Sequence, residues 1–236
     1  MIGTQVIEDL MLPVYKSLIK AYRNRSLDDV TSHGERISDM LFDMDMLLAT
    51  DPSSLLGNWL ESAKSYGDTD AEKALMEFNA RNQITLWGPD GQIEDYANKN
   101  WAGLVKNYYA QRWVLFKREL VICINDQRSY YDPTFRKKLM VLEKAWGRDR
   151  TEFPTTPIGD PLAIAEQLVG KYDAVYQLYA QDAEQVWALG RERTEFFASL
   201  GYLGAIEWRK EERRKRRAER AEKRCLLYTS PSPRDS

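Results

Sequence analysis

The sequence predicts an all-α protein, a helical bundle of about seven helices that includes one long aromatic-rich helix. Apolar residues recur at spacings of three and four through most of the chain, which is the period of a helix buried on one face. No strand-like alternation of useful length interrupts this pattern. The 236 residues, of which 43% are hydrophobic, suffice to build one sizeable core.

Two helices are expected at the start of the chain. The first covers residues 5–23, and Pro13 should kink it because proline removes a backbone donor. The second covers residues 27–49 and ends at Asp51-Pro52, since a residue before proline avoids the helical conformation. Their apolar faces are expected to contain Val6, Leu10, Val14, Leu18, Ala21, Val30, Ile37, Leu41, Met44 and Leu48.

Five further helices are expected along the rest of the chain. Two short ones cover residues 55–64 and 69–82, and the long aromatic-rich helix covers residues 93–125. In the long helix, the spacings of four, three and four put one set of residues on one face: Ala97, Trp101, Leu104 and Tyr108. Asp-Pro pairs predict a cap followed by a first-turn proline, so helices should open at Asp132-Pro133 and at Asp160-Pro161.

The charge of the chain is unevenly distributed. The formal net charge is −2, which implies no overall attraction to nucleic acid or membranes. Residues Arg209 to Arg224 hold ten Lys/Arg and four Glu, a balance of 10 − 4 = +6 that leaves −2 − 6 = −8 elsewhere. We expect this basic run to form a solvated helix with Glu–Arg pairs, such as Glu212 with Arg216. Nucleic acid or an anionic surface is the less favoured partner for it.

The sequence offers no set of residues for a metal or a cofactor. His33 is the single histidine, and the two cysteines are Cys123 and Cys225. Neither a disulfide framework nor a zinc site can be built from these residues. Glycine-rich phosphate loops and Ser-His-Asp sets are also missing from the sequence. We therefore expect no metal and no cofactor, and we expect Cys123 to be an inert buried thiol.

Trp87 is the candidate binding residue that stands out by its context. It precedes a turn signal, Gly88-Pro89-Asp90-Gly91, and belongs to neither neighbouring helical pattern. An indole on a tight turn can line a sugar-binding cleft, because its face stacks on the apolar face of a pyranose. The alternative is that Trp87 plugs the end of the helical bundle.

The same stretch carries a family resemblance through a series of spaced motifs. These motifs are Thr85-Leu86-Trp87-Gly88-Pro89, Gly91, Asp95-Tyr96-Ala97-Asn98-Lys99, Ala102-Gly103-Leu104-Val105, Tyr108-Tyr109 and Arg112-Trp113. Weaker agreement runs from Leu47 to Glu61 and from Phe153 to Tyr172, about the first three quarters of the chain. The stretch resembles the C-terminal α-helical region of the α-N-acetylglucosaminidase family.

The resemblance implies a function that we do not expect this chain to perform alone. Family members are glycoside hydrolases that remove terminal α-linked N-acetylglucosamine, in animals from heparan sulfate in the lysosome. Their catalytic barrel lies upstream and supplies two glutamates, and no residue of this chain matches either one. The implied partners are this barrel and an N-acetylglucosamine-terminated glycan, and the implied location of the full-length parent is lysosomal or secreted. Gln111 departs from the family, in which many members have proline.

The resemblance implies that two residues contact sugar. Trp87 would stack on the glycan, and Tyr96, expected one turn into the long helix, would offer its hydroxyl to a sugar oxygen. A core tyrosine is the alternative for Tyr96. Arg112 is expected to form a structural ion pair or to anchor a backbone carbonyl, instead of binding sulfate. Glu94 and Asp95 diverge by about 100° on a helix, so they cannot form a catalytic pair.

The sequence suggests three regions. Residues 1–172 correspond to the family's C-terminal helical domain in part, and residues 173–224 form a helical extension that ends in the basic run. Residues 225–236 differ in composition, and a nucleotide string that encodes Cys225 to Asp235 resembles a transposase adaptor used for sequencing libraries. We therefore expect this segment to be read-through into library DNA, with a genuine Ser/Pro-rich tail as the alternative.

Two functional classes remain open at this point. The chain is either a part of a glycoside hydrolase that lacks its catalytic glutamates, or a stand-alone helical interaction module without chemistry. The sequence leaves open whether copies of the chain form a homo-oligomer.

Overall fold

The computed structural model describes residues 2–88 and 93–177. The chain divides into two compact units, Met1–Tyr179 and Ala180–Ser236, and all described residues belong to the first. The expected basic run over residues 209–224 and the expected adaptor-derived segment over residues 225–236 therefore lie outside the described residues.

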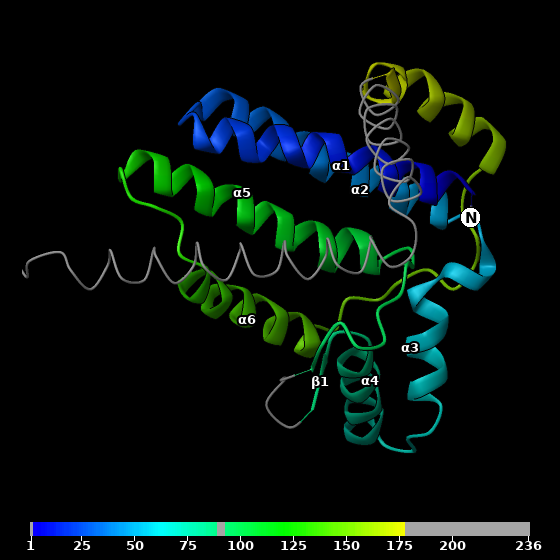
Figure 1. Cartoon of the computed structure of the whole chain (residues 1–236). Helices are drawn as coiled ribbons and strands as arrows, with labels where there is room; N and C mark the ends of the chain where they lie inside the picture. The colour runs from blue at the N-terminus through cyan, green and yellow to red at the C-terminus, as the bar shows by residue number, and fades with distance from the viewer. Residues whose placement is uncertain (1, 89–92, 178–236) are drawn as a thin grey trace, which may run out of the picture. The chain divides into compact units, whose positions relative to one another are not determined.

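The described residues form an all-α fold, as the sequence predicts (Figure 1). They contain six labelled α-helices, a further helix over residues 161–177, and two very short strands. The labelled helices are α1 (Ile2–Arg23), α2 (Leu27–Leu48), α3 (Leu56–Lys64), α4 (Asp70–Ile84), α5 (Ala110–Asn125) and α6 (Asp132–Arg148). Within the described residues, no helix is both long enough and apolar enough to cross a membrane.

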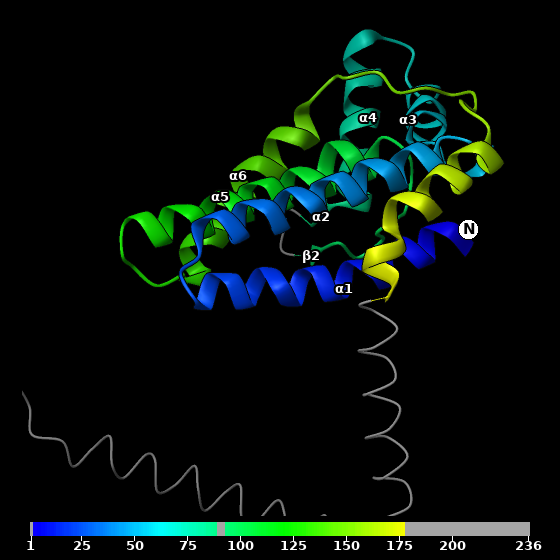
Figure 2. The ribbon, with the colours of Figure 1, turned by 90° about the horizontal axis from the view of Figure 1, so that it is seen from above.

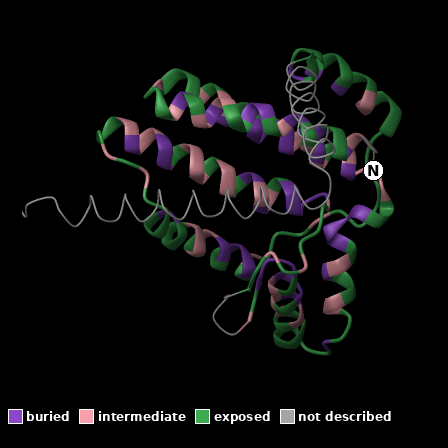
Figure 3. Ribbon diagram, viewed as in Figure 1, coloured by how far each residue is buried: buried purple, intermediate pink, exposed green. Residues whose placement is uncertain are grey.

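The larger apolar core lies between α1, α2 and α5. Figures 1 and 2 show α1 beside α2, and α5 beside α6. Each of these helices buries one side and exposes the other (Figure 3), as expected from their apolar spacing.

Pro13 lies inside α1, which is one helix from Ile2 to Arg23. Ile7 is buried in this core, whereas Val6 is 44% exposed, so the prediction for Val6 was wrong. Cys123 of α5 is also buried, as predicted.

A second, smaller core joins α3, α4 and α6 at one end of this unit. Its fully buried side chains include Leu56, Ile84, Leu104 and Tyr108. Helix α4 begins with a reciprocal cap, in which the Glu72 backbone N–H donates to Thr69 Oγ1 (3.2 Å) and the Thr69 backbone N–H donates to Glu72 Oε2 (2.9 Å).

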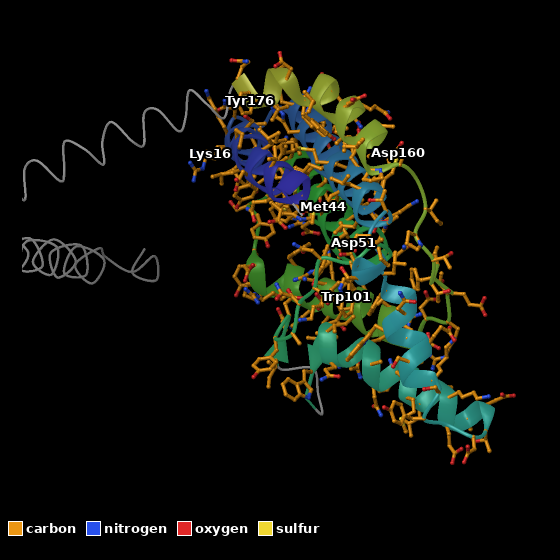
Figure 4. All side chains as sticks on the ribbon, turned by 90° about the vertical axis from the view of Figure 1, so that its right-hand side faces the viewer. Lys16, Met44, Asp51, Trp101, Asp160 and Tyr176 are labelled. Atoms are coloured by element: carbon orange, nitrogen blue, oxygen red, sulfur yellow. The ribbon has the colours of Figure 1, made fainter. Side chains whose placement is uncertain are left out.

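Of the two Asp-Pro pairs, only the second has its aspartate at the helix cap. Asp160 caps the helix over residues 161–177, because its Oδ1 accepts from the Leu162 backbone N–H at 2.9 Å. Figure 4 shows Asp160 and Tyr176 near the two ends of this helix. Asp132 is instead the first residue of α6, and Tyr131 occupies the cap position. Its carboxylate accepts from Arg136 Nε at 2.6 Å, one turn along the helix.

The long aromatic-rich helix is shorter than predicted. Helix α5 follows a π-helical turn over Val105–Tyr109, and the preceding segment is not helical. Ile93 and Glu94 pair as a strand, and Gly103 has a φ of 91°, which a continuous helix cannot contain. Asp45 Oδ1 accepts from the backbone N–H groups of Gly103 (2.7 Å) and Lys106 (2.9 Å), which supports a new helix start there.

This correction changes the environment of the two candidate binding residues. Ala97 and Trp101 do not share a helical face with Tyr108, although their spacing predicts it. Trp101 (labelled in Figure 4) packs instead against Trp59 of α3, with ring centroids 5.8 Å apart. Because the segment before α5 is not helical, its residues Ile93 and Glu94 can form one strand of a hairpin.

Candidate functional site

A short hairpin carries both residues that the sequence singles out. Strand β1 (Leu86–Trp87) pairs antiparallel with β2 (Ile93–Glu94), and Trp87 lies opposite Ile93. Gly88 has a φ of 102°, a left-handed conformation that suits glycine at the start of a turn. The tip, residues 89–92, lies outside the described residues. Trp87 is therefore the last residue of β1, directly before the turn of the hairpin.

Trp87 and Tyr96 meet at the surface of the protein. Their ring centroids are 4.6 Å apart and the rings are inclined by 53°. Trp87 is 43% exposed and Tyr96 is 66% exposed, so Trp87 does not plug the bundle and Tyr96 is not a core tyrosine. Tyr96 follows β2 in a turn and does not belong to a helix, contrary to the sequence-based expectation. Together the rings form an exposed aromatic pair of the kind that stacks on apolar faces.

The backbone between the hairpin and Tyr96 adopts an uncommon conformation. Asp95 has a φ of 54°, in the left-handed region that non-glycine residues rarely occupy. Its backbone N–H donates to the Thr85 carbonyl at 2.8 Å, and its own carbonyl accepts from Asn98 N–H at 3.2 Å. The Thr85 hydroxyl donates to the Arg81 carbonyl at 2.7 Å, which ties this turn to the end of α4. The direction of the Tyr96 side chain depends on this turn.

Arg112 of α5 connects this turn to the helical core. Its Nη1 donates to Asp95 Oδ2 at 2.7 Å, and its Nε lies 3.1 Å from Glu143 Oε1 on α6. The guanidinium also lies over the rings of Tyr108 and Tyr109, at 5.4 and 6.0 Å from their centroids. The prediction that Arg112 forms a structural ion pair is confirmed.

Burial dominates the electrostatics beneath the hairpin. The Glu143 side chain is 1% exposed, and neither of its oxygens makes a well-formed hydrogen bond within the described residues. Burial therefore raises the pKa of the Glu143 carboxyl, and the positive charge of Arg112 opposes this only in part. Burial also raises the pKa of Tyr108, and it raises the pKa of Tyr109 to about 12. Both phenols stay protonated at neutral pH.

This arrangement suits binding and not bond cleavage. Asp95 is bonded to Arg112, and Glu94 Oε2 lies 3.8 Å from Arg136 Nη1. Cleavage of a glycosidic bond by a retaining mechanism needs two carboxyl groups facing each other at about 5–5.5 Å across the substrate. The described part of the hairpin instead presents aromatic rings outward and engages its carboxylates in ion pairs.

Sequence reasoning missed Glu143, although a signal was present. Glu143 lies eight residues after Phe135 and three before Trp146, spacings that put all three on one helical face. Phe135 and Trp146 are both buried, so the same face carries a carboxylate into the interior. A charged residue within an apolar stripe indicates a partner, and here the partner is Arg112.

Comparison with known proteins connects this fold to one family of enzymes. The family model of the α-N-acetylglucosaminidase (NAGLU) C-terminal domain matches residues 2–171. Human α-N-acetylglucosaminidase is 37% identical over 169 residues, which cover 71% of this chain and 23% of the human protein. The chain thus spans about a quarter of the length of this relative.

Two solved structures from Clostridium perfringens share the fold. A family 89 glycoside hydrolase in complex with 2-acetamido-1,2-dideoxynojirmycin is similar at a TM-score of 0.63 and 24% identity, over 72% of this chain and 20% of that chain. A doubly substituted enzyme in complex with its substrate GlcNAc-α-1,4-galactose is similar at a TM-score of 0.62 and 25% identity, again over 72% and 20%.

The family match and the human relative agree with the motifs around the hairpin. The family match covers the strand that carries Trp87, the turn that carries Tyr96 and the helix that carries Arg112. The chain therefore belongs to the α-N-acetylglucosaminidase family, with that family's C-terminal domain over residues 2–171.

Proposed function

We propose that this chain is the C-terminal helical domain of a glycoside hydrolase that removes terminal α-linked N-acetylglucosamine from glycans. In this proposal the domain packs on the enzyme's catalytic barrel and helps to wall its sugar cleft with Trp87 and Tyr96. The observation that carries the proposal is the exposed pair of rings, 4.6 Å apart, on a hairpin inside the segment that matches the family.

The chemistry of the two rings supports a sugar as the ligand. A pyranose has an apolar face that stacks on an indole, and its hydroxyl groups need polar partners at the edge. Within the described residues, the Tyr96 hydroxyl makes no hydrogen bond to the protein, so it is available to a sugar oxygen. An aromatic platform with a free hydroxyl at its side suits a saccharide better than a purely apolar ligand.

The relatives support the identity of the glycan and the need for a second domain. The substrate of the Clostridium perfringens enzyme is GlcNAc-α-1,4-galactose, so a terminal α-linked N-acetylglucosamine is the proposed group. Heparan sulfate is the proposed glycan, and a lysosomal or secreted enzyme the proposed parent, because the family resemblance implies both. The relatives are four to five times longer than the matched segment, which leaves room for a barrel with both catalytic carboxylates.

A chimaeric enzyme tests the proposed role of the two rings. Residues 2–171 replace the matching segment of human α-N-acetylglucosaminidase, and hydrolysis of an aryl α-N-acetylglucosaminide is followed. Trp87→Ala is expected to lower kcat/KM by about 5- to 30-fold, since losing a stacked ring costs about 1–2 kcal/mol. Tyr96→Phe is expected to lower it less, because one hydrogen bond is lost.

The chain offers a matched control for these substitutions. Tyr66 is 81% exposed and lies between α3 and α4, away from the hairpin, so Tyr66→Ala should leave kcat/KM unchanged. The thermal midpoint of each variant is measured alongside, to separate binding from folding. Unchanged kcat/KM in both Trp87→Ala and Tyr96→Phe would show that the rings do not contact the substrate.

Sequencing the genomic DNA across both ends of this reading frame tests the proposed context. An in-frame barrel with two catalytic glutamates upstream, and a different continuation after Arg224, are the expected results. A stop codon directly before Met1, together with a genuinely encoded Cys225 tail, would favour the stand-alone helical module instead.

A further inference from the structure

The aromatic pair depends on one residue of uncommon backbone conformation. Asp95 separates β2 from Tyr96, and its φ of 54° turns the chain so that the Tyr96 ring returns toward Trp87. An aspartate tolerates this region better than most residues but does not favour it. Something outside the turn must therefore hold Asp95 in place.

The contacts of Asp95 identify what holds it. Its backbone N–H donates to the carbonyl of Thr85, the residue that ends α4, so this bond joins the turn to α4 through the backbone. The bond from its carboxylate to Arg112 Nη1 is different, because it joins the turn to α5. This charge-assisted bond links the side chain of Asp95 itself to the helical core.

The surroundings of Arg112 show that it is itself fixed. Its Nε lies 3.1 Å from Glu143 on α6, and the rings of Tyr108 and Tyr109 flank the guanidinium. Arg112 lies near the start of α5, directly after the π-helical turn that carries both tyrosines. A planar guanidinium held on its edge and on its face cannot rotate freely. The guanidinium of Arg112 therefore holds Asp95 at a fixed position relative to α5 and α6.

We propose that Arg112 is the positioning residue for the Trp87–Tyr96 pair, with Glu143 as the group that orients its guanidinium. Arg112 fixes the left-handed turn at Asp95, and this turn brings the Tyr96 ring against Trp87. The meaning of this device for catalysis rests on the proposed function, whereas the positioning itself is a property of this chain. Loss of Arg112 releases Asp95 to ordinary backbone conformations and separates the two rings.

Backbone amide hydrogen exchange on the full chain tests the proposal. In Arg112→Gln, amides of residues 94–98 are expected to exchange about tenfold faster or more, while amides of α1 and α2 keep their rates within about twofold. Arg128→Gln is the matched control, because Arg128 also pairs with a buried glutamate, Glu119 at 2.8 Å, but does not contact the hairpin. It should leave residues 94–98 unchanged. Equal acceleration of all helices in Arg112→Gln would overturn the proposal.

Two substitutions at Asp95 separate the ion pair from the backbone geometry. Asp95→Gly permits the left-handed turn but gives Arg112 no partner, whereas Asp95→Asn keeps an oxygen that can accept from Arg112. Asp95→Gly is expected to accelerate exchange at residues 94–98 as Arg112→Gln does, and Asp95→Asn much less. Wild-type exchange in Asp95→Gly would mean that the turn holds itself, and the proposal would be wrong.

The ring pair supplies a readout that a purely structural role would not move. The indole N–H resonance of Trp87, assigned with Trp87→Phe, senses the ring current of Tyr96, and Tyr96→Leu defines its position without that ring. In Arg112→Gln this resonance is expected to shift toward its Tyr96→Leu position; an unshifted resonance contradicts the proposal. The exchange and resonance experiments test the positioning of the rings, and their outcomes do not depend on the chimaera. In the chimaera, unchanged kcat/KM on loss of the rings would reject the proposed sugar contact but not the positioning by Arg112.

Discussion

Two arginines of this protein each contact a carboxylate and an aromatic ring, but they connect different parts of the structure. Arg81 of α4 is fully buried; its Nε and Nη2 donate to Glu77 Oε1 at 2.9 and 2.7 Å, and its guanidinium lies 4.9 Å from the Trp146 ring centroid. Arg112 also combines carboxylates with aromatic rings, but its side chain is 21% exposed, and that of its partner Asp95 is 30% exposed. Arg81 pairs with a residue of its own helix, whereas Arg112 connects two helices to a surface hairpin.

The difference separates stability from site geometry. The pair of Arg81 and Glu77 lies inside the smaller core, where water cannot replace a lost partner. Arg112 acts on Asp95, which water can reach, so its loss should mainly alter the hairpin. Buried ion pairs in one domain can therefore serve the core or the surface, depending on where the second partner lies.

The largest expected effect concerns Arg81. Arg81→Met leaves the Glu77 carboxylate buried without a partner, which should lower the free energy of unfolding by about 3–5 kcal/mol. Urea denaturation followed by circular dichroism measures this change. The double variant Glu77→Gln/Arg81→Met should recover much of the loss, since no unpaired charge remains. A loss below about 1 kcal/mol in the single variant would show that the interior tolerates the charge.

A smaller loss is expected for Arg112. Arg112→Met should lower the free energy of unfolding by about 1–3 kcal/mol, because water can solvate Asp95 and Glu143 can take up a proton. The same urea series gives the comparison with Arg81→Met. If Arg112→Met is the more destabilising of the two, Arg112 serves the core as much as Arg81 does.

The pH dependence of stability should distinguish two buried carboxyls. Burial raises the pKa of Glu143 above its ordinary value of 4.5, so the folded chain retains a proton that the unfolded chain releases. The contribution of Glu143 is thus fully present below pH 4.5 and is lost as the pH rises through its folded-state pKa. Unfolding free energies between pH 4 and 8 should fall less steeply with pH in Glu143→Gln than in the wild type.

Glu119 provides the opposite sign in the same experiment. Burial alone would raise its pKa, but hydrogen bonds from Lys138 and Arg128 outweigh this and lower it. Its contribution is present above its ordinary pKa and is lost as the pH falls through the folded-state pKa. Glu119→Gln should therefore weaken the loss of stability on acidification. The same pH response in both variants would contradict these assignments.

The smallest effect on stability is expected for the ring at the surface. Trp87→Ala should change the free energy of unfolding by less than about 1 kcal/mol, because Trp87 is 43% exposed and its ring partner is more exposed still. A loss above about 2 kcal/mol in the urea series would make Trp87 a core residue, and the alternative of a plug at the bundle end would return.

Sequence patterns were sufficient for most of the helices. The apolar spacing of α2 predicted its extent closely, since Leu27–Leu48 differs by one residue from the expected 27–49. Helix α4 ends two residues beyond its predicted end. Local signals succeeded in both helices because the residues that decide these helices are neighbours in the chain. Trp87 was selected from its position before a turn signal, and Tyr96 from the motifs of the family.

The start of the aromatic-rich helix could not be predicted in this way. Residues 93–103 have helical spacing, yet the structure uses them for a strand, a left-handed turn and a loop. Pairing with β1 and the bonds from Asp45 to Gly103 and Lys106 decide this outcome. Asp45 is distant in the chain, and helical periodicity carries no information about either partner.

By itself, the sequence determined that the protein is helical, where most helices lie, and which family the chain resembles, because spacing, caps and motifs are local properties. The tertiary structure alone decided that Trp87 and Tyr96 meet at the surface and that Arg112 reaches both Asp95 and Glu143. Glu143 illustrates the reason: a carboxylate on an apolar face acquires its partner and its raised pKa only when α5 and α6 pack together.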